Sequence, residues 1–286
     1  MSTLQLTTTY PHKRAFITGA GSGLGRELAL RLATDGWYIG IADISPVSLT
    51  ESKRLIEKNG GKVYDYVFDV SDRVAYQKDF EQYIKQVGGI DLLINNAGVG
   101  DGGLVEEYGL DNWEWIVGIN QMGVLYGCHF AIPIMKKQGF GHIINIASAA
   151  GFATMPNMSM YNVTKAAVIA LSETLYAELM PFGVYVSVVM PTFFKTNVMQ
   201  HGRGETQALK IGTAIVQRAK ILPQRVAKKI LHTAGKKKFH IFYPFQARLV
   251  WVIKRLLPFG FLWTKMTLFK RKEWLSKKIL DSSATY

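Results

Sequence analysis

The glycine-rich segment "TGAGSGLG", residues 18–25, is the strongest indication of the fold in this sequence. It follows the apolar residues 14–18 and runs directly into residues 23–35, which have the length and period of a helix. Glycines let the backbone turn tightly and approach a phosphate, and the helix offers free N–H groups and the positive end of its dipole. A glycine cluster also ends many strands that bind nothing, but the strand–glycines–helix context favours a phosphate loop.

Short apolar segments and amphipathic segments continue to alternate along the chain. The segments that we predict to be strands are residues 14–18, 37–43, 62–68, 90–96, 142–148, 184–190 and 238–243. The segments that we predict to be helices are residues 23–35, 46–59, 72–87, 111–137, 160–181 and 205–234. This alternation indicates a parallel sheet with helices on both faces, which right-handed crossovers make doubly wound. We therefore predict a Rossmann-type α/β domain of about seven strands over residues 1–245, with a C-terminal extension at 246–286.

Composition excludes several classes of protein. The single cysteine, Cys128, rules out a disulfide framework, and the six histidines lack the spacing of metal ligands, so we predict no metal site. The net charge is +13, of which residues 236–286 contribute +10 from twelve Lys or Arg and two acids. A nearly neutral body disfavours nucleic-acid binding.

The sequence also bears on location. The N-terminal residues lack the apolar core of a secretory signal, and no apolar run approaches the roughly 18 residues that span a bilayer. We expect a cytoplasmic protein, with peripheral association with a membrane left open by the extension.

Asp43 ends the second predicted strand, 18 residues after Gly25. An acid at this place can accept hydrogen bonds from the ribose hydroxyls of a dinucleotide and repels a 2′-phosphate. The glycine turn offers Ser22 and no basic residue, so NAD is favoured over NADP. The alternative is an acid at a helix N-terminus that only faces solvent.

Tyr161 and Lys165, in "SMYNVTKAAV" at 159–168, lie one helical turn apart on one face. An ammonium held there would stabilise a tyrosinate and lower a phenol pKa that is normally about 10. Such a tyrosine could move protons near neutral pH. Four-residue spacing of this kind also arises often by chance.

The motifs together resemble those of the short-chain dehydrogenase/reductase family, over roughly residues 13–245. Besides the glycine turn and "YNVTK" at 161–165, the resemblance rests on these motifs: "FDVSD" at 68–72, "NNAG" at 95–98, "VGINQMG" at 117–123, "INIASAAG" at 144–151 and "PTFFKTNV" at 191–198. One departure is that Thr192 follows Pro191 where the family usually has glycine.

The resemblance implies a role for each matching residue. Tyr161 would exchange a proton with the substrate oxygen, and Lys165 would lower the pKa of Tyr161 and hold the nicotinamide ribose. Ser148 would hydrogen-bond the substrate oxygen, and Asn120 would hold a water molecule beside Lys165. The residues implied to contact the cofactor, besides Tyr161 and Lys165, are Gly19, Ser22, Gly23, Leu24, Gly25, Asp43, Asp69, Val70, Asn96, Ala97, Gly98, Pro191 and Thr196.

We expect an NAD-dependent oxidoreductase for an apolar alcohol, ketone or aldehyde of lipid-, steroid- or retinoid-like character. The substrate loop at about 191–220 is rich in apolar residues, and Met155, Pro156 and Met158 add more beside Tyr161. Two alternatives are a cofactor sensor without turnover and a membrane-attached scaffold. The helices at 111–137 and 160–181 resemble those through which the family forms homodimers or homotetramers.

The extension has three possible uses. Read as a helix from Phe245, one face carries Leu249, Val252, Ile253, Leu256 and Leu257, and the other carries Arg248, Trp251, Lys254 and Arg255. This pattern fits an interfacial helix on an anionic membrane. The second use is a helix packed on the protein's own sheet or on a partner subunit, and the third is a segment at the mouth of the substrate pocket.

Overall fold

The computed structural model describes residues 4–200, 202–204 and 206–267. Seven strands form one sheet in the order β3-β2-β1-β4-β6-β7-β9, and every neighbouring pair is parallel. The strands are β1 (Arg14–Thr18), β2 (Tyr38–Asp43), β3 (Lys62–Val67), β4 (Leu92–Asn95), β6 (Gly141–Ile146), β7 (Val184–Pro191) and β9 (His240–Tyr243). The predicted α/β Rossmann-type fold is confirmed.

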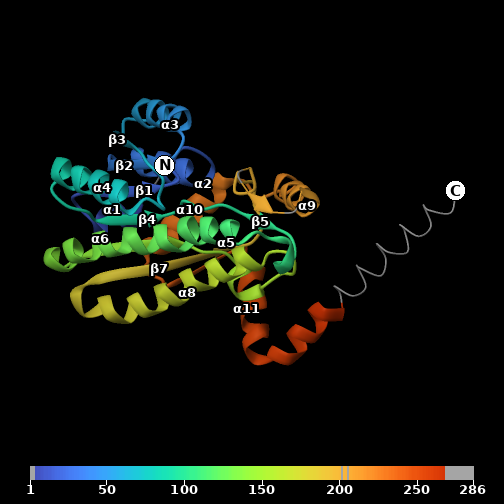
Figure 1. Ribbon diagram of the computed structural model, residues 1–286. Coiled ribbons are helices and arrows are strands. Elements are labelled where there is room, and N and C mark those ends of the chain that lie inside the picture. The colour runs from blue at the N-terminus through green and yellow to red at the C-terminus, as the bar shows by residue number, and fades with distance from the viewer. Residues whose placement is uncertain (1–3, 201, 205, 268–286) are drawn as a thin grey trace, which may run out of the picture.

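Helices cover both faces of this sheet (Figure 1). One apolar core lies under α1 (Gln5–Thr9), α2 (Gly23–Ala33), α3 (Pro46–Lys58) and α10 (Pro223–Gly235). The other core lies under α4 (Arg73–Val87), α6 (Gly123–Gln138), α8 (Ser159–Leu179) and α11 (Gln246–Leu256). Every residue of β1, β4 and β6 is buried. Burial on both faces explains why these strands are continuous apolar runs in the sequence.

The strand order reverses at β1, which has β2 on one side and β4 on the other. In open α/β sheets a ligand binds at such a switch point, outside the carboxyl ends of the strands. The glycine turn after β1 and residues 96–98 after β4 lie at this edge.

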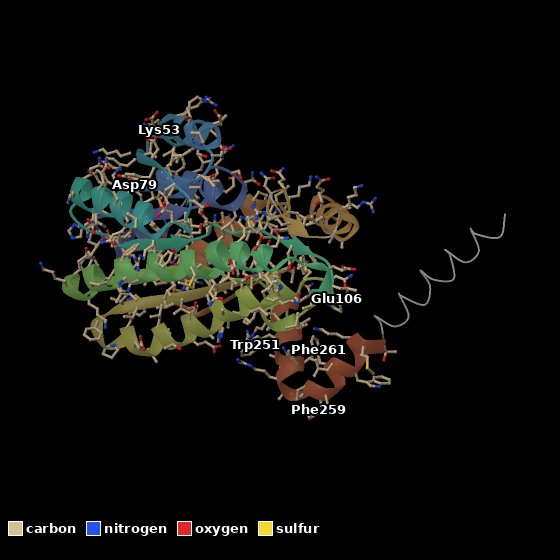
Figure 2. The ribbon with its side chains drawn as sticks, viewed as in Figure 1. Lys53, Asp79, Glu106, Trp251, Phe259 and Phe261 are labelled. Atoms are coloured by element: carbon tan, nitrogen blue, oxygen red, sulfur yellow. The ribbon has the colours of Figure 1, made fainter. Side chains whose placement is uncertain are left out.

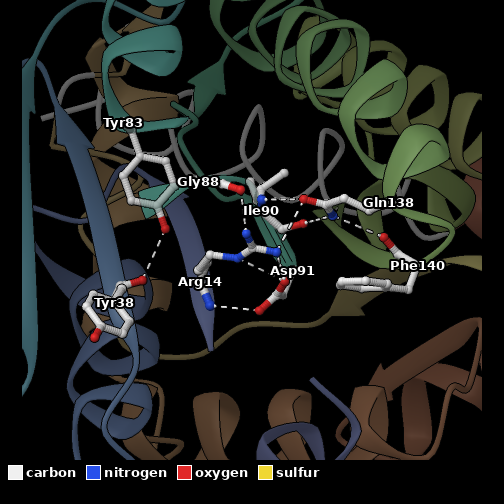
Figure 3. A network of polar contacts seen from close by, with 8 residues as sticks. All are labelled: Arg14, Tyr38, Tyr83, Gly88, Ile90, Asp91, Gln138 and Phe140. Carbon is white, nitrogen blue, oxygen red and sulfur yellow. Dashed lines mark hydrogen bonds and ion pairs between the residues drawn. The ribbon is translucent and has the colours of Figure 1, made fainter. Parts of the chain in front are cut away.

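A buried polar network lies at the amino ends of the strands, opposite the glycine turn (Figure 3). Asp91 Oδ1 accepts a 2.6 Å hydrogen bond from Arg14 Nη2, and Asp91 Oδ2 accepts one of 3.0 Å from the Arg14 backbone N–H. Gln138 joins it, accepting from Ile90 N and donating to the Ile90 carbonyl. The network ties β1, β4 and α6 together at their ends remote from the glycine turn.

Two predicted helices are divided. Residues 111–137 form α5 (Leu110–Val117), a π-helical turn η2 (Gly118–Met122) and α6, and residues 205–234 form α9 (Thr206–Gln217) and α10. Pro223 stands in the first turn of α10, where a missing N–H costs nothing. The other short elements are β5 (Asp101–Gly102), β8 (Arg203–Gly204), η1 (Val105–Glu107), α7 (Ala150–Ala153) and η3 (Met180–Phe182).

The predicted extension begins as α11 and continues as a helix over residues 258–267, while its residues 268–286 lie outside the described part of the chain. Figure 1 shows both helices projecting from the side of the domain. Throughout residues 4–200, 202–204 and 206–267, every helix is too short or too polar to cross a lipid bilayer.

Candidate active site

Most of the predicted cofactor residues line one cleft at the carboxyl ends of the strands. The cleft has a volume of about 790 Å³. Its lining includes Gly19, Ser22, Gly23, Leu24, Asp43, Asp69, Val70, Asn96, Ala97, Gly98, Tyr161, Lys165, Pro191 and Thr196. Gly25, Asn120 and Ser148 lie outside that lining. Residues that are distant in the sequence thus meet where the parallel topology places them.

The glycine turn is shaped to let a ligand approach the backbone. Gly19 has a φ of +64°, a left-handed conformation that favours glycine. A Cβ at Gly25 would overlap the carbonyl oxygen of Gly19, so Gly25 lets α2 begin close to the turn. Ser22 precedes α2 without capping it through its side chain. The turn and the start of α2 fit a pyrophosphate group.

Asp43 closes the cleft beside this turn. Its Oδ2 accepts a 2.8 Å hydrogen bond from Gly21 N, and its Oδ1 accepts one of 3.0 Å from Ser45 N. Arg26 lies nearby but donates to the carbonyl oxygens of Gly21 and Ser48 and to Ser52 Oγ, and it does not line the cleft. The acid therefore faces the cleft and the neighbouring arginine does not.

The side chain of Asn96 is held by backbone groups at the border of the cleft. Its side-chain amide donates to the carbonyl oxygens of Thr18 at 2.9 Å and of Gly19 at 3.0 Å. The Thr18 hydroxyl in turn accepts from Asn96 N and Ala97 N. Asn96 lines the cleft, yet its amide binds the segments after β1 and β4 to each other.

Tyr161, Lys165 and Ser148 come together where α8 meets the end of β6. The Lys165 ammonium lies 5.6 Å from the centre of the Tyr161 ring and donates a 3.1 Å hydrogen bond to the carbonyl oxygen of Ile146. Ser148 hydrogen-bonds the Tyr161 hydroxyl, and its Oγ accepts from Ala150 N at 3.1 Å. A phenol, a hydroxyl and an ammonium thus share one corner of the cleft.

The pKa of Tyr161 differs from the prediction. Burial raises this pKa to about 12, the hydrogen bond from Ser148 lowers it, and the charge of Asp101 raises it. Burial lowers the pKa of Lys165 to about 8. Desolvation of the phenol therefore outweighs the stabilisation of tyrosinate that the four-residue spacing predicts.

Asn120 acts from behind the cleft. It lies in the π-helical turn η2 and is fully buried. Its Oδ1 accepts from Val99 N at 2.8 Å, and its amide donates to the Val99 carbonyl at 2.9 Å and to Thr164 Oγ1 at 3.3 Å. π-helical turns often occur at functional sites, and here the turn places Asn120 against the loop after β4 and the helix of Tyr161.

A second pocket of about 350 Å³ adjoins the cleft at Tyr161. The two share Tyr161, Pro191, Phe194, Thr196 and Val198. The second pocket also includes Ser148, and its apolar walls include Ala153, Met155, Phe193, Ile215, Val216, Ala247 and Val250. An apolar molecule in this pocket would reach Ser148 and Tyr161.

Sequence reasoning missed Asp101, which also lines the second pocket. Its Oδ2 accepts a 3.2 Å hydrogen bond from the backbone N–H of Tyr161, and burial raises its pKa to about 6. The one available signal is a single acid in the glycine-rich run "GVGDGG" at 98–103. Ala247 and Val250 of the predicted extension also line the second pocket.

No group of three His, Cys, Asp or Glu side chains within the described ranges is arranged to hold a metal ion.

Known proteins are similar to this chain in sequence. The family model described as short chain dehydrogenase matches residues 13–207. A "Probable oxidoreductase EphD" of Mycobacterium tuberculosis is 33% identical over 253 residues, and the match covers 85% of this chain and 43% of that protein. The chain therefore spans less than half the length of this relative. An uncharacterized oxidoreductase of Staphylococcus aureus is 30% identical over 81% of this chain and 94% of its own length.

Solved structures of known proteins are similar to this chain in fold. A short chain dehydrogenase/reductase from Burkholderia phymatum in complex with NAD has a TM-score of 0.80 and 32% identity, covering 85% of this chain and 94% of its own. An NAD⁺-bound xylitol dehydrogenase has a TM-score of 0.69 and 26% identity, covering 81% and 97%.

Proposed function

The chain belongs to the short-chain dehydrogenase/reductase family, and from that premise we propose that it is an NAD-dependent oxidoreductase. It interconverts an apolar secondary alcohol and its ketone, or an alcohol and its aldehyde. The observation that carries this proposal is the junction of the two pockets at Tyr161, where a dinucleotide-sized cleft meets an apolar pocket. Bound in the cleft, NAD supplies hydride-transfer chemistry.

The residues of the chain supply positions and a proton. Gly19, Gly23 and the start of α2 hold the pyrophosphate, and Asp43 holds the adenosine ribose. Ser148 donates to the substrate oxygen and fixes its direction, and Tyr161 gives that oxygen its proton or removes it. Because the pKa of Tyr161 is about 12, the phenol holds its proton at neutral pH and can act as the acid.

Lys165 and Asn120 support Tyr161. The Lys165 pKa of about 8 keeps this side chain mainly charged at neutral pH, beside the place where a tyrosinate would form. Asn120 fixes the loop after β4 against α8 through its bonds to Val99 and Thr164. We assign Lys165 to electrostatic support of Tyr161 and to the nicotinamide ribose, and Asn120 to positioning.

The substrate class follows from the second pocket. Met155, Phe193, Ile215, Val216 and Val250 offer apolar contacts on several sides, and the polar groups gather at the Ser148–Tyr161 end. Such a pocket suits a molecule with one oxygen function at the end or edge of an apolar body.

The first test is turnover of apolar alcohols with NAD, followed as formation of the reduced cofactor. Tyr161→Phe removes the proton donor and little contact area. We expect kcat to fall by about 10²-fold or more, while the Kd for NAD changes by less than about threefold. Tyr64→Phe, on the edge strand β3, is the matched control and should retain activity. Tyr161→Phe activity close to wild type on every accepted substrate would refute the assignment.

The second test concerns the choice of cofactor. Asp43→Ser removes an anion that repels a 2′-phosphate and accepts hydrogen bonds from the ribose. We expect NAD binding to weaken by about tenfold and NADP binding to strengthen. Asp79→Ser removes one half-buried acid of α4 that does not line the cleft, so it should change neither affinity (Figure 2). A wild-type protein that binds NADP more tightly than NAD would show that Asp43 does not select the cofactor.

A further inference from the structure

The extension exposes its apolar face instead of burying it. Large apolar side chains of α11, the residues beside it and the helix at 258–267 are each at least 47% exposed; they are Phe245, Leu249, Ile253, Leu256, Leu257, Phe259, Leu262, Trp263 and Met266. We call these nine residues the apolar face. Contiguous exposed apolar surface of this kind marks a binding site.

Specific contacts fix the direction of this face. Ala247 is buried against the domain, and the Trp251 ring lies 5.5 Å from Phe242. Lys254 Nζ donates to the Phe152 carbonyl at 2.6 Å, and Lys265 Nζ donates to the Thr154 carbonyl at 2.8 Å. Figure 2 shows Trp251 where α11 meets the domain and Phe259 at the outer edge. The extension is therefore attached by Trp251 and its lysines, with the apolar face turned outward.

The charge of the same segment selects among possible occupants. Residues 245–267 include Arg248, Lys254, Arg255 and Lys265 and contain no acid. Lys254 and Lys265 donate to carbonyl oxygens of the domain, and Arg255 lies 3.7 Å from Glu173. Arg248 and Arg255 are the exposed cations of this segment. Two copies that met through this segment would bring like charges together, which opposes self-association. An anionic lipid surface offers both apolar burial and opposite charge.

The rim of the second pocket adjoins the extension. Met155, Phe193 and Ile215 line this pocket and are 47%, 48% and 44% exposed. Val250 of α11 lines it too, and Lys265 binds Thr154, the residue before Met155.

We propose that the apolar face docks the protein on an anionic bilayer and brings the pocket rim to the lipid. An apolar substrate would then pass from the lipid into the pocket, a consequence that rests on the proposed function. The docking itself does not depend on turnover.

The test of docking is co-sedimentation of the full chain with vesicles of phosphatidylcholine and phosphatidylserine. We expect binding at low salt that weakens with salt and is weaker with phosphatidylcholine alone. Leu256→Glu with Phe259→Glu, at positions 74% and 86% exposed, should weaken binding by about tenfold or more. The control Val74→Glu, 71% exposed on α4, should bind like the wild type.

Two results would overturn the docking proposal. One is absence of wild-type binding to the anionic vesicles, including the case where light scattering shows a dimer that Leu256→Glu with Phe259→Glu dissociates. The other is unchanged binding of that double variant.

The orientation has its own test. Cys128, the single cysteine, is buried, so an environment-sensitive dye attaches to an introduced thiol. Dye on Met155→Cys should become brighter when vesicles are added, and dye on Val74→Cys should not. If the protein binds and the Met155→Cys dye stays in water, the pocket rim does not face the lipid. None of these measurements needs turnover, so failure here and failure of the proposed activity are distinguishable.

Discussion

Burial raises the pKa of the Tyr161 phenol, and its hydrogen bond with Ser148 lowers that pKa. The spacing of Tyr161 and Lys165 correctly predicts that the two side chains share one side of α8 and one cleft. It does not predict the sign of the pKa shift, because that sign depends on desolvation and on Asp101. Asp101 lies 60 positions before Tyr161, and nothing in the local spacing announces it.

For the other site residues too, the motifs predict the position but not every contact. The glycine turn and Asp43 lie where the motifs place them, because strand ends in a parallel sheet share one edge. For Asn96 and Asn120 the motif gives the position but not the partners, which are backbone groups of Thr18, Gly19 and Val99. The chemical roles of all these residues stay predictions.

Asp101 gives a residue-scale prediction about pH. Its pKa is about 6 in the folded protein against an ordinary 3.8, so between these values the folded state binds more protons than the unfolded state. The free energy of unfolding at this site therefore falls as pH rises, by up to about 3 kcal/mol. Asp101→Asn keeps an acceptor for Tyr161 N and removes this penalty, so its stability relative to the wild type should increase from pH 4 to pH 7.

Urea unfolding of both proteins across that range measures the difference, since all other groups titrate alike in the two. A difference that does not vary with pH would contradict the effect assigned to Asp101.

At the scale of elements, the strands were predictable because burial on both faces leaves a continuous apolar run. The π-helical turn η2 was not, since residues 111–137 keep one helical period through it. The two-residue pairing of β5 and β8 joins Asp101 and Gly102 to Arg203 and Gly204 through backbone hydrogen bonds, which have no sequence signature. These unpredicted elements lie beside the candidate site, whereas the predicted strands and helices hold most of its residues.

The Arg14–Asp91 pair gives a prediction at this scale. Asp91 is fully buried and accepts three hydrogen bonds from Arg14, so removal of the carboxylate leaves a buried cation without its partner. We expect Asp91→Ala to lower the free energy of unfolding by about 3–5 kcal/mol. NAD affinity of the folded protein should not change, because the pair lies at the amino ends of the strands and the cleft lies at their carboxyl ends.

The matched control is Asp65→Ala. Asp65 pairs with Lys53 at 2.8 Å, and both side chains are about one-third exposed. Loss of such a pair should cost less than about 1 kcal/mol. Equal costs in urea unfolding would mean that burial does not set the value of the Arg14–Asp91 pair.

At the scale of the whole molecule, the extension at 246–286 is partly built into the domain. Its sequence shows two faces of different polarity but not which of them meets the domain. Trp251 and Lys254 belong to the face that carries charge, yet they contact the domain through Phe242 and the Phe152 carbonyl. A ring and a long side chain with a terminal donor reach buried partners that hydrophobic periodicity does not count.

Two truncations separate the parts of the extension. A chain ending at Leu257 keeps Ala247, Val250 and Trp251 and loses only the Lys265–Thr154 bonds among the contacts described above. We expect it to stay within about 1–2 kcal/mol of the full chain in urea unfolding. It should bind vesicles more weakly, because it lacks Phe259, Leu262, Trp263 and Met266 of the apolar face. A chain ending at Phe245 also uncovers Phe242 and opens the second pocket, so it should lose at least about 3 kcal/mol.

NAD binding should survive in the chain ending at Leu257, because the described residues that line the cofactor cleft end at Arg203. Unfolding curves and NAD titrations of the two truncated chains measure both effects. If the chain ending at Phe245 is as stable as the longer one, α11 is not a wall of the domain. If the chain ending at Leu257 instead loses much more free energy of unfolding than the bonds from Lys265 account for, the residues after Leu257 stabilise the fold directly.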